Sequence, residues 1–273
     1  MIDKRDVQSF FDRLAPGWDA ELVRNEPVIA AILDNAGVQP GVRVLDVACG
    51  TGVLFRDYAT RQAGHVTAID LSPEMAARAA EKAAGTCIEV VCGDVETDVQ
   101  VQESAPYDVV MVYNAFPHFP DPAGLIRRLS GLLRPGGRLS IAHGMSRAAL
   151  DAHHSGSAHA VSMRLLPEEE VRALMAPYLD VDVVMVYNAF PHFPDPAGLI
   201  RTLAGLVRPG GRLSIAHGMS RAALDAHHSG SAKPVSLGLL HEDEVRALMA
   251  PYLDVDTVIS NGEMYQVCGR KRA

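Results

Sequence analysis

The chain has 273 residues, of which 48% are hydrophobic and 21% charged, and its formal net charge is −8. Lysine and arginine are scattered, apart from a basic cluster at 270–272, so there is no basic face for a nucleic-acid partner. No apolar run reaches the roughly 18 residues that a membrane span needs. The four cysteines lack CxxC spacing and fit free thiols of a reducing cytoplasm. We therefore expect a cytoplasmic protein with a small-molecule partner.

Two amphipathic helices are predicted before the first strand. Apolar residues have helical spacing over 5–14, and Ala15-Pro16-Gly17 should end that helix. A second helix is predicted over 26–36, stopped by Gly37 and Pro40. Trp18, the single tryptophan, follows the first helix and is either a packing residue or part of a lid over a site.

A buried strand and a glycine-rich turn follow at Val44-Leu45-Asp46-Val47-Ala48-Cys49-Gly50-Thr51-Gly52. An apolar run stops at small residues and a helical pattern over 53–60 comes next, which is typical of a strand that feeds a tight loop. Gly50 and Gly52 have no side chain, so the loop backbone can approach a ligand closely. Asp46 lies near the carboxyl end of the strand, where open α/β sheets bind ligands.

The next predicted strand, 66–70, ends in a second acidic residue. Asp70 lies 24 positions after Asp46, close to the interval of roughly 20 residues at which α/β nucleotide folds place a ribose-binding carboxylate. Ser72 and Pro73 then fit the N-cap and first position of a helix.

Three more strands are predicted over 88–92, 108–113 and 138–142, with a helix over 122–133 and an Arg-Pro-Gly-Gly turn at 134–137. Strands that alternate with helices indicate an α/β fold with a doubly wound, mostly parallel sheet. A terminal pair of strands, 257–260 and 264–268, is expected to supply the antiparallel part.

The second half of the chain contains an internal repeat. Residues 108–181 recur as 182–255, at an offset of 74, with nine differences. Two copies of a βαβα segment do not make a solenoid, so we interpret the repeat as a segmental duplication, natural or engineered. Either copy could fill the fourth and fifth strand positions of one domain that spans 1–273, with 256–273 as its terminal strand pair.

The extra copy has strand edges and an apolar face that must be covered. It could pack as an annex, or it could complete the sheet of a neighbouring molecule by domain swapping. Self-association is therefore expected, with a domain-swapped dimer as one form that it could take.

Taken together, these residues resemble class I S-adenosylmethionine-dependent methyltransferases, in the small-molecule branch related to the ubiquinone and menaquinone methyltransferases. Four stretches match in order: 44–52, Ala-Ile-Asp-Leu-Ser-Pro-Glu-Met at 68–75, Gly-Asp-Val at 93–95, and the strand at 108–113 with Leu-Arg-Pro-Gly-Gly-Arg-Leu at 133–139. Residues 11–19 also look like that branch's N-terminal segment. The resemblance implies a Rossmann-like fold and methyl transfer by in-line displacement, with S-adenosylhomocysteine as product.

The resemblance also implies roles for individual residues. Asp70 would accept the ribose hydroxyls, and Asp46 would organise the loop or meet the ammonium group of the cofactor. The family usually has Gly where this chain has Ala48. The full set of cofactor residues expected is Trp18, Asp46, Ala48, Gly50, Thr51, Gly52, Asp70, Leu71, Met75, Asp94, Val95 and Asn114.

Two histidines are candidate general bases. His118 follows the fourth strand and His143 ends the fifth, and both are predicted on the rim above the cofactor. Either could instead be an ordinary loop residue. His143, His153 and His154 fit no zinc template, so no metal is expected. The alternative function is a cofactor-binding chain that the duplication has impaired catalytically. A nicotinamide oxidoreductase is disfavoured because GxGxxG is missing.

Overall fold

The structure is a computed structural model that describes residues 2–144, 158–163, 165–179, 183–187, 190–193, 195–228, 239–262 and 264–272. The chain divides into two compact units, one made of 1–144 and 149–166 and the other of 145–148 and 167–273. In the described parts, no helix has the length and apolar character to cross a membrane. The prediction of a single domain over 1–273 stays a prediction.

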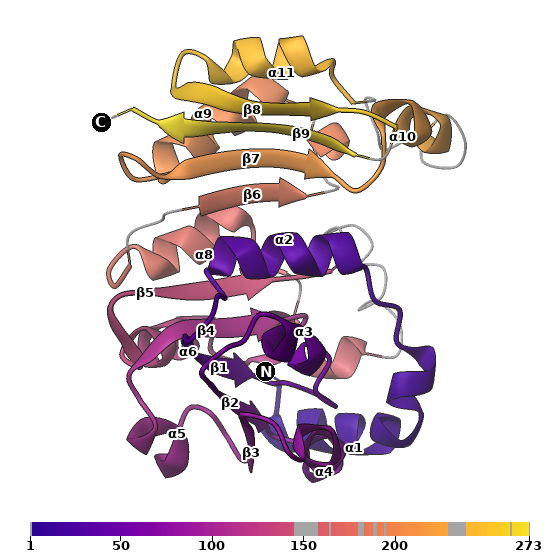
Figure 1. Ribbon diagram of the computed structural model, residues 1–273, viewed down its shortest axis with the longest axis vertical. Coiled ribbons are helices and arrows are strands. Elements are labelled where there is room, and N and C mark those ends of the chain that lie inside the picture. The colour runs from indigo at the N-terminus through magenta and orange to yellow at the C-terminus, as the bar shows by residue number, and fades with distance from the viewer. Residues whose placement is uncertain are drawn as a thin grey trace. The chain divides into compact units, whose positions relative to one another are not determined.

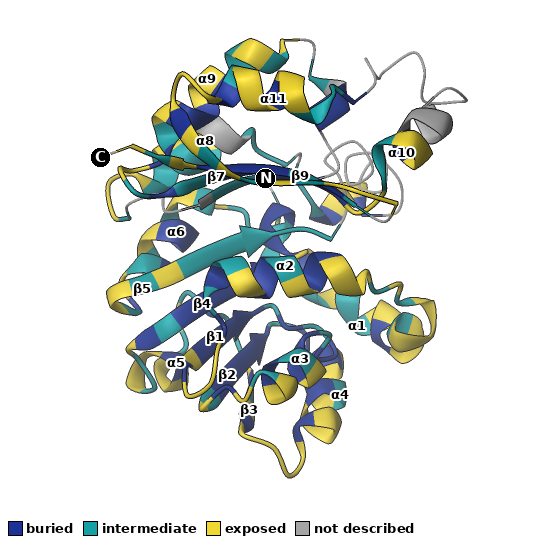
Figure 2. Ribbon diagram, turned by 45° about the horizontal axis from the view of Figure 1, so that its top comes forward, coloured by how far each residue is buried: buried dark blue, intermediate teal, exposed yellow. Residues whose placement is uncertain are grey.

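Unit 1 is built on a parallel five-stranded sheet in the order β3-β2-β1-β4-β5 (Figure 1). The central strand β1 pairs with β2 on one side and with β4 on the other, so that Asp46 lies between Ala68 and Met111. Side chains of the central strands are mostly buried, whereas β5 is half-buried (Figure 2). The strands are β1 Arg43–Val47, β2 His65–Asp70, β3 Ile88–Cys92, β4 Tyr107–Tyr113 and β5 Leu133–Ala142.

The helices of unit 1 connect these strands as the alternating pattern predicts. Two local signals act as expected: Ser72 caps α4 by accepting from the Met75 N–H, and Gly37 ends α2 with φ +80°. The short helix α5 was not predicted. The helices are α1 Lys4–Glu21, α2 Glu26–Ala36, α3 Phe55–Thr60, α4 Pro73–Ala83, α5 Val99–Glu103 and α6 Pro122–Ser130, with short 3₁₀ turns η1 Phe116–His118 and η2 His159–Val161.

The first helix is longer than predicted. The sequence predicts an end at Ala15-Pro16-Gly17, but α1 runs on to Glu21 with Pro16 inside it. Proline removes one backbone donor and disfavours a helix interior. Side-chain contacts on both sides of Pro16 oppose that cost: Asp12 accepts from Ser72 and Asp19 from Thr51. Tertiary contacts thus hold a helix that the local sequence would break.

Unit 2 is a four-stranded sheet in the order β6-β7-β9-β8, with β6 and β7 parallel and the last two strands antiparallel. Its core gathers apolar side chains from β7, β9 and the helices, among them Leu213, Ile215, Tyr265 and Val267. The elements are α8 Glu168–Met175, β6 Val183–Tyr187, η3 Phe190–His192, α9 Pro196–Leu206, β7 Arg212–His217, α10 Arg221–His228, α11 Glu242–Met249, β8 Leu253–Ser260 and β9 Tyr265–Lys271.

The two sequence repeats form the same strand pair. In unit 1, β4 and β5 pair in parallel with Val109 opposite Arg138 and Tyr113 opposite Ala142. In unit 2, β6 and β7 pair with Val183 opposite Arg212 and Tyr187 opposite Ala216, which is the same register moved by 74 positions. The two sheets differ in the strand beside each pair, because β4 pairs onward with β1 whereas β7 pairs onward with β9.

Candidate active site

The glycine-rich loop leaves the carboxyl end of β1 in an unusual backbone conformation. Ala48, Gly50 and Gly52 all have positive φ, at 53°, 57° and 83°. A Cβ at Gly52 would lie 2.6 Å from the Phe55 ring, so only glycine fits there. The left-handed conformation of Ala48 costs about 1–2 kcal/mol relative to glycine, which gives a physical reason for the glycine usual in the resembling family.

Asp70 ties this loop to the end of β2. Its Oδ2 accepts from the Gly50 N–H at 2.8 Å, and its Oδ1 accepts from the Ser72 N–H at 2.9 Å. Burial raises the pKa of Asp70 to about 6, although the two backbone donors favour the carboxylate. The predicted ribose acceptor is therefore also a structural link between two loops. Each carboxylate oxygen keeps a second lone pair for a ligand hydroxyl.

Asp46 is a buried acid below the loop, with 2% of its surface exposed. Burial raises its pKa to about 8, the Tyr58 hydroxyl opposes that rise, and the charge of Asp70 adds to it. At neutral pH the carboxyl of the ligand-free protein therefore holds its proton. A positively charged group in the site would favour the carboxylate again.

We expect the ligand-free protein to lose stability as the pH rises from 5 to 8. A carboxyl with a pKa of 3.8 when unfolded and about 8 when folded holds its proton only in the folded state across this range. The unfolded state then binds fewer protons, so the free energy of unfolding falls by up to about 1.4 kcal/mol per pH unit. Asp46→Asn should flatten this fall, which thermal melts at pH 5, 6, 7 and 8 would measure.

The matched control for this experiment is Glu81→Gln, which changes an exposed acid in the same unit. Its melting temperatures should follow the wild-type curve across the four pH values. Equal pH slopes for Asp46→Asn and the wild type would contradict a protonated Asp46.

The loops after β2 and β3 carry the remaining predicted adenine contacts. Met75 is 1% exposed and Val95 4%, so both already pack inside unit 1, while Leu71 is half-buried. Asp94 accepts from the Glu96 N–H at 3.1 Å and from the Lys4 ammonium at 2.6 Å. The structure thus brings these residues to the carboxyl ends of β2 and β3.

Helix α1 reaches three of these loops through polar side chains that the sequence analysis missed. Lys4 bonds to Asp94, Asp12 accepts from Ser72 at 2.5 Å, and Asp19 accepts from Thr51 at 2.5 Å. Lys82 of α4 also donates to Asp19, at 2.8 Å. Periodicity marks only the apolar face of a helix, so it gives no signal for these contacts.

Trp18 and His118 belong to one aromatic group. The Phe11 ring packs edge-on against both, at centroid distances of 5.9 Å to Trp18 and 5.0 Å to His118. The Nδ1 of His118 lies 2.8 Å from the carbonyl oxygen of Val161. A carbonyl only accepts, so Nδ1 carries the proton and Nε2 is the basic nitrogen.

Asn114 and His143 directly follow strands β4 and β5. Asn114 has a positive φ of 57°, and its Oδ1 accepts from the Gly144 N–H at 2.7 Å. Asparagine tolerates this conformation better than most residues. The amide thus fixes the turn after His143, while its role towards a cofactor stays a prediction.

The repeated histidines have different surroundings. His217, the counterpart of His143, is 1% exposed in unit 2 and packs edge-on to Tyr265 at 6.0 Å. The loop histidines His153 and His154 lie outside the described residues. Among the residues that are described, no group of three or more His, Cys, Asp or Glu side chains could hold a metal ion.

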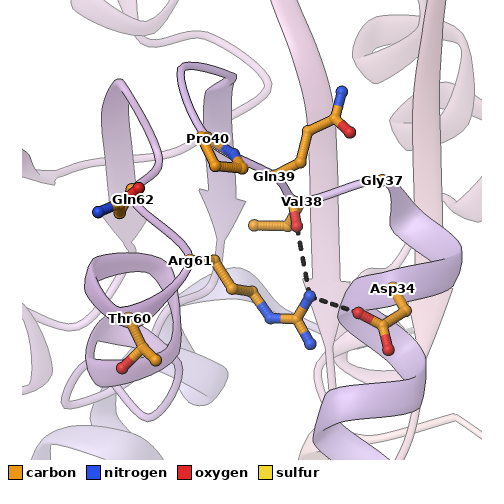
Figure 3. A pocket seen from close by; sticks show the side chains of 8 residues that line it. All are labelled: Asp34, Gly37, Val38, Gln39, Pro40, Thr60, Arg61 and Gln62. Carbon is orange, nitrogen blue, oxygen red and sulfur yellow. Dashed lines mark hydrogen bonds and ion pairs between the residues drawn. The ribbon is translucent and has the colours of Figure 1, made fainter.

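A pocket lies between the end of α2, the segment 37–40 that precedes β1, and residues 60–62 at the end of α3 (Figure 3). Arg61 crosses it and donates to Asp34 at 2.5 Å and to the Val38 carbonyl at 3.3 Å. A third bond joins Arg61 to the Ala30 carbonyl at 3.0 Å. The guanidinium is thus used to join α2 to α3, which is a structural role.

Comparison with known proteins finds a methyltransferase domain. Residues 44–137 match the family model described as "Methyltransferase domain". The match contains the glycine-rich loop, Asp70 and Asp94. The match supports the methyltransferase class that the sequence predicts for this segment, and the observed α/β sheet confirms the predicted fold class.

Among curated relatives, the ubiquinone biosynthesis O-methyltransferase of Xylella fastidiosa is 38% identical over 151 residues, 51% of this chain and 61% of that protein. The protein of the same name from Aeromonas salmonicida is 33% identical over 147 residues with the same coverage. The chain thus covers 61% of the length of each relative. The crystal structure of coclaurine N-methyltransferase bound to N-methylheliamine and SAH is 26% identical over 43% of this chain and 35% of that chain, with a TM-score of 0.39.

Proposed function

We propose that this chain transfers a methyl group from S-adenosylmethionine to a hydroxyl group of a small molecule. The observation that carries the proposal is the Asp70 carboxylate at the end of β2, bonded to the N–H of Gly50 in the glycine-rich loop. The carboxylate lies beside bare backbone at the carboxyl ends of parallel strands, where α/β sheets bind ligands, and this position supports a role for Asp70 as the acceptor for ribose hydroxyls. The O-methyltransferase relatives support the choice of a hydroxyl acceptor.

The residues around the loop fit this cofactor. In the proposal, Asp70 accepts from the ribose, the backbone at 48–52 and Asp46 face the methionine part, and Trp18 covers the site. Met75, Leu71 and Val95 would form the apolar surroundings of the adenine, with Asp94 accepting from its amine. When bound, the cofactor supplies a methyl group already activated by its sulfonium, so alignment accounts for most of the rate.

His118 is proposed as the general base. A hydroxyl must lose its proton as its oxygen forms the new bond to the methyl carbon, while the bond from that carbon to sulfur breaks. The proton would pass to Nε2 of His118, because Nδ1 is held by the Val161 carbonyl. His143 is the second candidate, at the end of β5 beside the Asn114 turn.

Two measurements test the proposal on the full chain: calorimetric titration with S-adenosylmethionine and S-adenosylhomocysteine, and formation of S-adenosylhomocysteine with a panel of phenols and catechols. We expect His118→Ala to lower turnover by about 10²- to 10⁴-fold with cofactor affinity unchanged. The matched control is His159→Ala, an exposed histidine of the same unit, which should keep full turnover. Cofactor binding without product from any acceptor would favour the catalytically impaired alternative.

We also propose that the chain associates with itself. Among the described residues, β5 and β6 each end a sheet with one edge that no strand pairs with, and such edges favour pairing with another chain. All four cysteines are free thiols, which supports the proposal of a reducing compartment such as the cytoplasm.

A further inference from the structure

Residues 158–163, which we call the positioning segment, lie against the loop that carries His118. The Nδ1 of His118 lies 2.8 Å from the carbonyl oxygen of Val161. The Met163 N–H donates to the Pro117 carbonyl at 2.7 Å. The segment is therefore joined both to the His118 ring and to the backbone of the residue before it, although about 40 residues of chain separate the two.

Helix α1 holds the positioning segment in place. Ala158 and Val161 of the segment are buried with Val7 of α1 in one apolar cluster, and Phe11 packs against that cluster. The Phe11 ring also lies edge-on to the His118 ring, at a centroid distance of 5.0 Å. The imidazole is thus fixed by a carbonyl oxygen and by an aromatic ring, both of which depend on the packing of the segment on α1.

The Val161 carbonyl is presented by a tight turn. The Val161 N–H donates to the Ala158 carbonyl at 3.0 Å, so that His159 and Ala160 are the two central residues of the turn. The Ser162 hydroxyl donates to the same carbonyl at 2.8 Å. Proline is disfavoured at the second central position of such a turn, because it forces the preceding residue out of the helical conformation. Position 160 is therefore sensitive to proline.

The two copies of the repeat, 108–181 and 182–255, differ at this position. Four of their nine differences fall within the short stretch of 159–164, and proline, Pro234, stands in the second copy where the first has Ala160. Residues 229–238 lie outside the described residues, so the comparison here is one of sequence. The first copy has a sequence compatible with the turn, whereas the second has proline at its sensitive position.

We propose that Val161 is a positioning residue whose carbonyl holds His118 in the Nδ1–H tautomer, and that the first copy of the repeat therefore supplies the base. The inference rests on the proposed function and specifies which copy serves it. A neutral imidazole accepts a proton only at the nitrogen that carries none. Loss of the turn would release Nδ1, so the ring would populate both tautomers and Nε2 would be basic in only part of the molecules.

Nitrogen-15 NMR of the full chain with labelled histidine tests this tautomer directly. Spectra are recorded at a pH where the ring is neutral, and the signals lost in His118→Ala identify the residue. We expect the Nδ1–H tautomer in the wild type and a mixture in Ala160→Pro. The same variant should lower kcat about tenfold or more. Its KM for the acceptor and its affinity for S-adenosylhomocysteine should stay within about twofold, because only the chemical step is affected.

Three matched variants separate positioning from a general effect on the fold. Ala160→Ser is compatible with the turn and should keep both the tautomer and kcat. Pro234→Ala and His192→Ala change the equivalent positions of the second copy and should also keep kcat. Loss of turnover in His192→Ala would assign the base to the second copy and overturn the proposal.

Two further results would contradict the role of Val161: an Nε2–H tautomer of His118 in the wild type, or an unchanged tautomer and kcat in Ala160→Pro. If Ala160→Pro fails to fold, the wild-type spectrum and His192→Ala still decide. The tautomer is read without cofactor or turnover. A chain that shows the Nδ1–H tautomer but methylates no acceptor would therefore contradict the proposed function and leave the contact between Val161 and His118 intact.

Discussion

Asp70→Asn is expected to weaken binding of S-adenosylhomocysteine by about 100-fold or more, because bonds to a charged acceptor are worth about 1.5–3 kcal/mol each. The substitution keeps the size of the side chain but leaves a single oxygen. Both oxygens of Asp70 accept backbone N–H groups, from Gly50 and Ser72. One of these donors would then face an NH₂ group, which shifts the loop in addition to removing the acceptor for the ribose.

Asp108→Asn is the matched control for this effect. Asp108 is an acid at the opposite end of the sheet, and its Oδ2 accepts from the Arg43 N–H at 2.7 Å. Both variants should lose stability in thermal melts, since each loses a carboxylate that holds a backbone donor. Calorimetric titration should show a loss of affinity for Asp70→Asn alone. Equal affinity in the two variants would remove Asp70 from the cofactor site and leave it a purely structural role.

Sequence reasoning found the elements whose causes are local. The glycine-rich loop, the end of β2 at Asp70 and the Ser72 cap follow from short-range signals: small residues at a turn, a strand-terminal acid and a hydroxyl before proline. Such signals do not depend on the rest of the fold. They were sufficient to predict the α/β sheet and the segment that matches a methyltransferase domain.

The parts that sequence reasoning missed depend on contacts between distant segments. Helix α1 continues through Pro16, with Asp12 and Asp19 bonded to residues 60 and 32 positions away. The sequence of the helix itself contains no signal that identifies those partners. The second hydrogen bond of Asp70, to a loop 20 positions earlier, was invisible for the same reason.

The internal repeat limits prediction from the sequence in a second way. Two nearly identical segments have the same local preferences, and β4–β5 and β6–β7 accordingly share one register. What distinguishes them is supplied once in the chain: β1 pairs with β4, and β9 pairs with β7. The sequence therefore predicts that the neighbouring strands occur once although the repeated strand pair occurs twice. It cannot predict which of the two strand pairs each neighbouring strand will join.

We expect a chain without residues 182–255 to fold as a single unit of 273 − 74 = 199 residues. The deletion joins Val181 to Asp256 and recreates the Leu-Asp-Val-Asp-Thr sequence that begins β8 at Leu253. The deletion removes β7 and its Arg-Leu-Ser-Ile-Ala-His segment. Strand β9 can then pair with the identical segment of β5, residues 138–143. Thermal unfolding should show one cooperative transition, and the backbone N–H groups of 138–143 should exchange more slowly with solvent than in the full chain.

Cofactor binding by the shortened chain tests whether one copy of the repeat is sufficient for the site. The loop at 44–52 and Asp70 occur once in the sequence, whereas the second half of the domain occurs twice. The shortened chain should bind one S-adenosylhomocysteine per molecule, with an affinity within about threefold of the full chain, since the removed copy is distant from Asp70 in sequence and supplies none of its bonds. Deletion of 108–181 instead gives a matched chain that differs at nine positions and should behave alike. A monomeric shortened chain that melts cooperatively but fails to bind would show that both copies serve the site. In that case, completing the sheet would not be the only role of the repeat.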